Sequence, residues 1–376
     1  MTEDGATRRI VEGATWAEFC DTLKSAGDVI LHGSRAEDVL DRAEGFRYLS
    51  RLTRAALEAF VEHADPLAPV LFRPVHETAK MGADHPDNHY LWARISGEHE
   101  YVIRGNRRTV HYLGLGTYAG FYGSGGRSSQ TGFLEGSELR LGPGGEFEIS
   151  LSRERRPGNW LPLAADTSSL IVRQTFLDRA SERAAELRIE RVGGDGKPTP
   201  PTATRIDEGL SAAARLVWGA SMMFASWTQD FAERPNELPR FDPERSLGAH
   251  GDPNIAYYHG YWSLGPDEAL VVEAKPPDCP HWNFQIDNVW MESLDYRYHR
   301  IALNKHDAVL RPDGTVRVVV AHDDPGHPNW LRTVGHRHGT MCWRWVRAAE
   351  HPQPVTRVAK LADVREEHAR ERRQGG

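Results

Sequence analysis

The sequence lacks the features that mark disulfide-rich, membrane-spanning or secreted proteins. Its three cysteines, Cys20, Cys279 and Cys342, are far apart and form no CxxC pair, so neither a disulfide framework nor a thiolate zinc site is indicated. No apolar run approaches the roughly 18 residues that a membrane span requires, and the opening MTEDGATRRIVEG has no secretory-signal pattern. We expect a cytoplasmic protein without a membrane span.

Charge of one sign is not in strong excess either. Lysine and arginine number 46 against 53 for aspartate and glutamate, which gives a net charge of -7 and a pI near 6.2. This balance provides no basic surface for nucleic acid, so no nucleic-acid partner is expected. The sequence also has no GxSxG, P-loop or HExxH motif and no GxGxxG that precedes a helical pattern. Nucleotide and nicotinamide chemistry, and a redox cofactor, are therefore not expected.

Helical periodicity is present in two segments. The segment 35–65 carries apolar residues at steps of three and four, and Asp65-Pro66 ends it. The second segment has the most regular period, and Thr204 with Asp207 forms a capping-box pattern at its start. The residues expected on one face are Phe46, Leu49, Thr53, Ala56 and Phe60 in the first helix, and Ile206, Leu210, Ala213, Val217, Ala220, Phe224, Trp227 and Phe231 in the second.

From about residue 70, short β-prone segments alternate with turn residues, a pattern typical of antiparallel sandwiches. The pattern occurs twice. HPDNHYLWARISGEHEYVIRG resembles GDPNIAYYHGYWSLGPDEALVVEA, and an Asn-Trp-Leu segment follows each, 71 residues from Asn88 to Asn159 and 75 from Asn254 to Asn329. We therefore predict a mainly β fold: two tandem jelly-roll-like antiparallel β-sandwiches, with N-terminal helices and a long linking helix.

The expected organisation has five parts. FLDRASERAAELRIERVGG predicts a helix that closes the first sandwich, DGKPTPPTAT is a proline-rich connector, and REEHARERRQGG is expected to be a solvated tail. The expected boundaries are 1–68 for the N-terminal helical segment, 69–195 for the first sandwich with its closing helix, 196–245 for the connector and long helix, 246–362 for the second sandwich, and 363–376 for the tail.

Histidines gather around the Asn-Trp-Leu segment of the second copy only. His336 and His338 of GHRHG are two residues apart, so on a strand they share a face, as the HxH pairs of sheet metal sites do. They are candidate ligands for one divalent metal ion, zinc or iron. Alternatively, His322 or His336 acts as a general base tuned by Asp324, or the flanking glycines make the pair part of a surface loop.

The second copy also contains a candidate ligand pocket. In HWNFQIDNVW, Trp282 and Trp290 lie on one strand face, and Asn283 and Asp287 on the other. This arrangement gives either the floor and walls of a pocket or an ordinary solvated face. Phe224 of the long helix either packs in the core or contacts the same ligand.

Three residues are candidates for stabilising negative charge. Tyr296 and Arg297 in SLDYRYH can polarise a carbonyl or bind a carboxylate, and the alternative is a salt-bridged strand end. Arg344 is the third, and it recurs as Arg173 in the first copy.

Features that recur in both copies are expected to be architectural. Asn159 and Asn329 would satisfy turn backbone groups with their side-chain amides, and Trp330, like the tryptophan of the first copy, would fill the sandwich edge. Asn329 and Trp330 are also candidate substrate contacts.

The first copy holds HPDNH before its first strand. His85 and His89 would suit a metal ion only on a helix, and Pro86 between them favours a loop. We therefore expect turn and capping roles for Asp87 and Asn88.

The C-terminal part of the chain resembles a known bacterial family. ALVVEAKPPDCPHWNFQIDNVWMESLDYRY, LRPDGTVRVVVAHDDPGHPNWLRTVGHRHGTMCWRW and PQPVTRVAKL are similar to the domain of unknown function 1214, and HPDNHYL with RRPGNWLPL resembles more loosely its companion 1254-type domain. The resemblance implies two jelly-roll-like sandwiches and an enzyme of lipid, steroid or other apolar-compound metabolism. The positions that match the family motif are His322, Asp324, Asn329, Trp330, His336, Arg337 and Arg344, whereas His338 is particular to this chain.

The resulting hypothesis is an enzyme without a redox cofactor. It would act on an apolar or aromatic small molecule, such as a lipid, steroid or terpenoid-like compound, in a pocket of the second sandwich beneath the 206–231 helix. Hydrolysis, elimination and isomerisation each suit a His322 or His336 base with Tyr296, Arg297 or Arg344 stabilising negative charge. The alternatives are a non-catalytic binding or assembly protein, including a homo-oligomer, and a metal-dependent enzyme that uses GHRHG.

Overall fold

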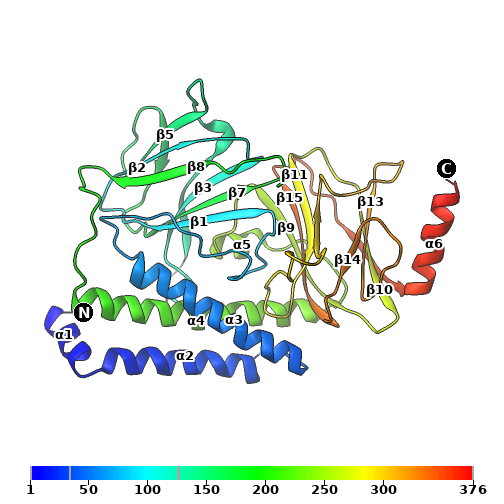
Figure 1. Ribbon diagram of the computed structural model, residues 1–376, viewed down its shortest axis with the longest axis horizontal. Coiled ribbons are helices and arrows are strands. Elements are labelled where there is room, and N and C mark those ends of the chain that lie inside the picture. Colours follow the sequence, from blue (N-terminus) through cyan, green and yellow to red (C-terminus); the bar gives the residue numbers. More distant parts are fainter. Residues whose placement is uncertain (1, 34, 125–127, 375–376) are drawn as a thin grey trace.

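The chain folds into a mainly β structure with helices along one side (Figure 1). The computed structural model describes residues 2–33, 35–124 and 128–374. Within them, sixteen strands form four sheets of four strands each. The strands of the first half are β1 (Asn88–Arg94), β2 (Tyr101–Asn106), β3 (Tyr112–Ala119), β4 (Ser129–Glu135), β5 (Glu146–Ser152), β6 (Asn159–Pro162), β7 (Ser169–Thr175) and β8 (Glu186–Arg191). Those of the second half are β9 (Ile255–Ser263), β10 (Glu268–Ala274), β11 (His281–Ile286), β12 (Ala302–Asn304), β13 (Val316–Ala321), β14 (Trp330–Arg332), β15 (His338–Val346) and β16 (Val355–Lys360).

The two halves of the chain have the same sheet topology. The first half forms sheets of strand order β1-β7-β3-β4 and β6-β5-β2-β8, and the second half forms β9-β15-β11-β12 and β14-β13-β10-β16. Each strand of the first half therefore has a counterpart eight strands later, and the parallel pair β5 with β6 has its counterpart in β13 with β14. The predicted mainly β fold, with two tandem sandwiches and helical additions, is confirmed.

Each sandwich has its own core of side chains from alternate strand positions. The first is filled mainly by aliphatic residues such as Ile103, Leu115 and Ile149, which are fully buried. The second contains more rings, and Trp282 stacks on Trp343 with ring centroids 5.1 Å apart. Trp282 is therefore a core residue of the second sandwich.

Helices cover the sandwiches along one side. In Figure 1, α2, α3 and α4 run beneath the first sandwich, α3 and α4 reach the near edge of the second, and α6 packs at its far end. None of the described helices is both long and apolar enough to cross a membrane. The helices are α1 (Glu3–Val11), α2 (Ala14–His32), α3 (Val39–Leu57), the π-helical turn η1 (Glu58–Glu62), the 3-10 turn η2 (Gly136–Glu138), α4 (Ala203–Ala232), α5 (Pro243–Gly248) and α6 (Leu361–Gln374).

The long predicted helix corresponds to α4. Its periodic apolar positions from Leu210 to Phe224 are buried, as the spacing predicts. The predicted cap is wrong by two residues, because the side chain of Thr202 accepts the hydrogen bond from the backbone N–H of Arg205 at 3.2 Å. Thr204 instead donates to a carboxylate oxygen of Glu3 in α1.

The buried face of α3 lies about one residue from the predicted face. Phe46 is 49% exposed, whereas Gly45, Tyr48 and Leu52 are buried. Gly45 explains the difference, because the absence of a side chain there lets the ring of Trp290 pack directly against the helix. Because glycine has no apolar side chain, the periodicity of apolar residues does not mark Gly45 as buried and instead predicts a buried face that includes its neighbour Phe46.

The prediction of a closing helix is wrong. The segment expected to be a closing helix contains β8, in which Ile189 pairs opposite Ile103 of β2 and completes the sheet. This cross-strand pairing outweighs the helical propensity of the alanine and glutamate residues before it. The charged tail is mostly exposed over residues 365–373, as expected, but it is helical and belongs to α6. Leu361 and Val364 at the start of α6 are buried against β10 and β13 and hold the helix in place.

Replacing Gly45 with alanine is expected to destabilise the protein. The added Cβ would lie 2.6 Å from Trp290 and 2.7 Å from Ile30, so we expect a loss of about 1 to 3 kcal/mol in the free energy of unfolding, measured by urea titration. Gly27→Ala in α2 is the matched control, because a Cβ there meets nothing within 4 Å. It should leave stability unchanged or raise it by up to about 1 kcal/mol; equal effects of both substitutions would contradict this packing.

Candidate functional site

Two buried arginines at matching positions join the sandwiches. Arg173 on β7 donates to the backbone carbonyl of His250, which precedes β9, and Arg344 on β15 donates to the carbonyl of Ala83, which precedes β1. Both carbonyl-bearing residues have left-handed backbones, with φ of 60° and 54°. Non-glycine residues hold this conformation only where their surroundings fix it. Each arginine therefore fixes the turn that leads into the other sandwich.

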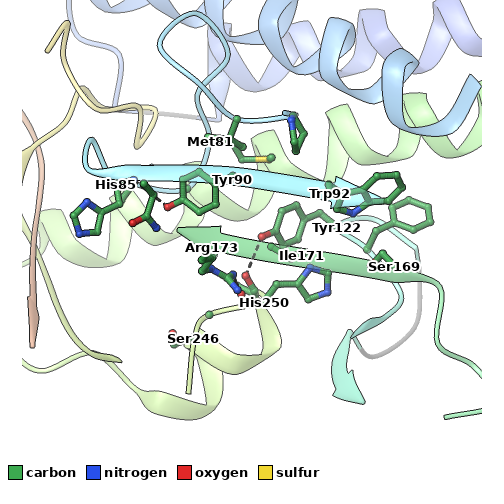
Figure 2. Close-up of a pocket in the computed structure, with 18 of the residues that line it drawn as sticks. Met81, His85, Tyr90, Trp92, Tyr122, Ser169, Ile171, Arg173, Ser246 and His250 are labelled. Carbon is green, nitrogen blue, oxygen red and sulfur yellow. Dashed lines mark hydrogen bonds between the residues drawn. The ribbon is translucent and has the colours of Figure 1, made fainter. Parts of the chain in front are cut away.

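A cavity of about 190 Å³ lies where the sandwiches meet the helices. We call it the intersandwich cavity. Its walls come from β1, β7 and β9, from the end of α3 with η1, and from α4 and the α5 region (Figure 2). Since a liquid water occupies roughly 30 Å³, the cavity has room for a small organic molecule. Its aromatic lining consists of Phe60, Tyr90, Trp92, Phe121, Tyr122, Phe224, Trp227, Phe241 and Tyr257.

The polar lining of the cavity is basic. Arg94, Arg173 and Arg344 reach it, and none of the described residues that line it is acidic. Burial alone would lower the pKa of Arg173, but the nearby Tyr118 and Asp252 outweigh burial and raise it. The guanidinium therefore stays charged. Because a guanidinium has five N–H donors, Arg173 and Arg344 keep donors for a bound acidic group beside their structural bonds.

Two histidines in the cavity wall are neutral near pH 7. Burial and the charge of Arg173 lower the pKa of His250 to about 3. Burial, with Arg344 and Arg245, lowers the pKa of His259 to about 3 as well. Tyr122 keeps its proton, because burial raises its pKa to about 12, and its hydroxyl donates to the carbonyl of Ala249 at 2.9 Å.

One of these histidines contacts a serine. Nε2 of His250 lies in hydrogen-bond contact with Oγ of Ser128, just before β4. Figure 2 shows His250 close to Arg173 and Tyr122 on the same side of β7. His250 and Arg173 line the cavity, and Ser128 contacts this histidine without being part of the described lining. A hydroxyl, a neutral imidazole and a guanidinium are a set that can support nucleophilic attack with charge stabilisation.

Comparison with solved structures finds a relative that matches nearly the whole chain. An uncharacterized protein from Burkholderia cenocepacia, known from its crystal structure, is 51% identical, with a TM-score of 0.93, over 95% of this chain and 99% of that chain. The chain belongs to the family of that protein. A protein from Vibrio parahaemolyticus is 13% identical over 84% of this chain and 98% of that chain, with a TM-score of 0.48. No family model and no curated protein matches the sequence.

Only two of the predicted site residues line the intersandwich cavity. They are Arg344 and Phe224, from β15 and α4. The predicted pocket beneath the long helix therefore lies between the two sandwiches, whereas the sequence hypothesis places it within the second.

The GHRHG histidines bind carboxylates of α3. Nε2 of His336 lies 2.7 Å from Glu44, and Nε2 of His338 lies 2.8 Å from Asp41. Burial opposes the charged form of all four groups, but the pairing outweighs it, so the pKa values of both histidines are raised and those of both carboxyls are lowered. The pairs hold α3 against the second sandwich, and neither histidine is left free as a base or as half of an open metal site.

The other predicted catalytic residues lie apart from the cavity. His322 is half-buried at the end of β13, where Nδ1 lies 2.8 Å from the hydroxyl of Thr333. Asp324 is exposed and accepts a hydrogen bond from a backbone N–H of its own turn at 2.7 Å. Arg297 forms two hydrogen bonds with Asp295, as the salt-bridge alternative predicts. The ring of Tyr296 lies beneath the ammonium of Lys80, 4.5 Å from its centroid.

The predicted substrate contacts of the second copy are mostly internal. Asn283 and Asp287 are buried, and Asp287 accepts from Gln285 at 2.6 Å, in a polar network that faces the turn before β1. The indole of Trp290 donates to the carbonyl of Asp41 and packs under α3. This strand face is neither solvated nor part of the cavity lining; it is buried in the interface between the halves.

Asn329 has an architectural role. Its amide donates to the carbonyls of Val309 and Arg317 and accepts from the N–H of Val309. Asn159 makes the same set of backbone bonds in the first half, so the prediction from recurrence is confirmed for this pair. The indole of Trp330 donates to the carbonyl of Ala321 at the sandwich edge.

The pairing of the GHRHG histidines predicts a pH-dependent stability. Because the histidine pKa values are raised on folding, their contribution is complete below about pH 6.5 and decreases as the pH rises through the folded values. Because the carboxyl pKa values are lowered, their contribution is present above about pH 4 and is lost on acidification. We therefore expect His336→Gln with His338→Gln to cost on the order of 2 kcal/mol at pH 5.5 and clearly less at pH 9.

Urea titrations of the double variant and the natural chain across that pH range would measure the difference. His32→Gln is the control, because His32 is exposed on α2 and its replacement should change stability by less than about 0.5 kcal/mol at every pH. A cost that stays constant from pH 5.5 to 9 would contradict a charged histidine in these pairs.

Proposed function

We propose that the chain binds a small, largely apolar molecule with an acidic group in the intersandwich cavity. The observation that carries this proposal is the combination of an aromatic lining with three arginines and no acidic residue among the described lining residues. Aromatic walls favour an apolar or aromatic body, and buried guanidinium groups favour a carboxylate, sulfate or phosphate. The ligand class agrees with the expectation from the sequence of an apolar or aromatic substrate, with the acidic group added.

The electrostatic potential of the cavity also favours a ligand with an acidic group over a ligand with a neutral polar group. Burial is the main cause of the lowered pKa values of His250 and His259, and the charges of Arg173 and Arg344 lower them further. The same positive potential that disfavours a protonated imidazole favours an anion. A ligand carboxylate would partly neutralise the arginines.

A pair of fluorescent probes tests the proposal. The aromatic sulfonate 8-anilinonaphthalene-1-sulfonate should bind in the cavity, and Arg94→Gln or Arg344→Gln should weaken its binding by about tenfold or more, because each removes a charge-assisted contact. The neutral N-phenyl-1-naphthylamine should lose little affinity in the same variants. Ile171→Trp, which fills the cavity, should weaken both probes.

Arg104→Gln is the matched control, since Arg104 lies on the surface of β2 and pairs with Glu148 and Glu190. It should leave both probes unaffected, and circular dichroism should show that each variant is folded. Equal losses for the charged and neutral probes in the arginine variants, or no effect of Ile171→Trp, would show that the cavity is not an anion-selective site.

The contact of Ser128 with His250 favours a second candidate function, hydrolysis of an ester of such a molecule. Oγ of Ser128 would attack the ester carbonyl while its proton passes to Nε2 of His250; the alcohol would leave with that proton, and water would then release the acid. Arg173 lies beside this pair and would stabilise the charge on the carbonyl oxygen. Because a base of pKa about 3 is weak, we expect slow turnover.

Hydrolysis of 4-nitrophenyl butyrate would measure this activity. Ser128→Ala and His250→Gln should abolish it, and Ser129→Ala, at the neighbouring exposed serine, should leave it intact. Because the pKa of His250 is lowered to about 3, the rate should persist down to about pH 4, where an ordinary histidine is protonated. A rate that Ser128→Ala does not change would eliminate this candidate.

A further inference from the structure

A group of three potential metal ligands lies where the turn before β1 meets the second sandwich. His85 and Asp87 belong to this turn, and His281 begins β11. One ligand atom of each residue lies within 4.8 Å of the other two. Oδ2 of Asp87 is 3.9 Å from Nδ1 of His85 and 3.7 Å from Nε2 of His281. The same oxygen accepts a hydrogen bond from Asn304 at 3.0 Å, which orients the carboxylate.

The two imidazoles are buried and incompletely satisfied. His85 is 3% exposed and His281 is 0% exposed. In the part of the chain that the structure describes, both ring nitrogens of His281 and Nε2 of His85 have no hydrogen-bond partner. A buried polar group without a partner costs about 1 to 3 kcal/mol.

The duplicated fold provides an internal comparison for this group. Tyr90 and Tyr257 lie opposite the two interface arginines, and each hydroxyl accepts a hydrogen bond from the backbone N–H five residues earlier, at 3.2 Å in both halves. This register matches His85 with Asp252. The alignment of Asn88 with Asn254 by sequence is therefore off by one residue, and Asp87 is the counterpart of Asn254.

The matching place in the other half is closed by its own hydrogen bonds. There the hydroxyl of Tyr112 donates to Asp252 at 2.9 Å and accepts from the amide of Asn254 at 3.3 Å. The fold is thus satisfied at this position without any ion. The three potential ligands occupy the corresponding places. His281 and Tyr112 each lie two residues before the residue that pairs with the interface arginine. His85 corresponds to Asp252, and Asp87 corresponds to Asn254.

We propose that His85, Asp87 and His281 bind one divalent transition-metal ion, zinc or iron(II). Two imidazoles and one carboxylate are a ligand set for these ions and leave a coordination position for water or a ligand. Magnesium and calcium require oxygen ligands. The charges of Arg344 and Arg179 act on His85 and disfavour any cation, so the ion that binds must form strong bonds to imidazole nitrogen.

The ion would replace one existing contact and border the intersandwich cavity. Nδ1 of His85 accepts a hydrogen bond from the backbone N–H of Asp87 at 3.1 Å, which coordination through that nitrogen would displace. His85 is also part of the cavity lining, and Figure 2 shows it just before the start of β1, near Tyr90. The metal site does not depend on the identity of the cavity ligand or on hydrolysis.

Metal titration of the whole chain tests the proposal. Protein purified without an affinity tag and treated with a chelator should bind about one equivalent of zinc by calorimetry, with a rise in melting temperature. Bound cobalt(II) should show the visible absorption expected for nitrogen and oxygen ligands. Under anaerobic conditions, iron(II) should compete with zinc for the same site. His281→Gln, His85→Gln and Asp87→Asn should each weaken zinc binding on the order of 100-fold or more.

Two control variants distinguish zinc binding at this site from binding elsewhere in the protein. Tyr112→Phe changes the matching cluster of the other half, and His336→Gln changes the GHRHG pair; both should retain the full equivalent of zinc. Failure of zinc, iron(II) and cobalt(II) to bind, zinc binding that His281→Gln leaves unchanged, or loss in His336→Gln alone would overturn the proposal. Since zinc itself is the probe, a negative result with the fluorescent acids would leave this test unaffected.

Discussion

The structure depends on two buried arginines that cross between the halves of the chain. A buried guanidinium needs partners for its charge, and here Arg173 and Arg344 each donate one hydrogen bond to the turn that leads into the opposite sandwich. The exchange fixes both turns in left-handed conformations and brings β1 and β9 to a common interface. Because the same guanidinium groups also face the space between the sandwiches, the interaction that joins the halves also gives the cavity its charge.

Duplication explains why one interface holds two kinds of chemistry. The arginines, the tyrosines opposite them and the Asn159 and Asn329 turns are kept in both halves because each supports the frame. The places next to the arginines differ. One holds a tyrosine, an aspartate and an asparagine that satisfy each other, and the other holds two histidines with unpartnered nitrogens. Where a duplicated frame is kept and the side chains within it change, the change is the better indicator of function.

The fold was largely predictable from the sequence, because local periodicity determines it. The alternation of the strands and the period of α4 survive in the structure, whereas β8 depends on pairing with β2 and its sequence resembles a helix. The site was predictable only in part. His85 and His281 are 196 residues apart, and each looks like an ordinary loop or strand residue until the strand register places them together. In the sequence, Arg173 is recognisable only as the counterpart of Arg344 in the repeat. The repeat does not reveal that both arginines line one cavity.

Helix α3 supplies the partners of the GHRHG histidines, which the sequence around them does not reveal. The partners of His336 and His338 are Glu44 and Asp41, almost 300 residues away in the chain, so the sequence around GHRHG contains no sign of them. Ala55 in the last turn of the same helix lines the cavity, together with Ala59 and Phe60 of the following turn η1. Docking of α3 by the two ion pairs therefore also builds one cavity wall. A ligand that contacts this wall binds only the docked state, so ligand binding and docking of α3 must stabilise each other.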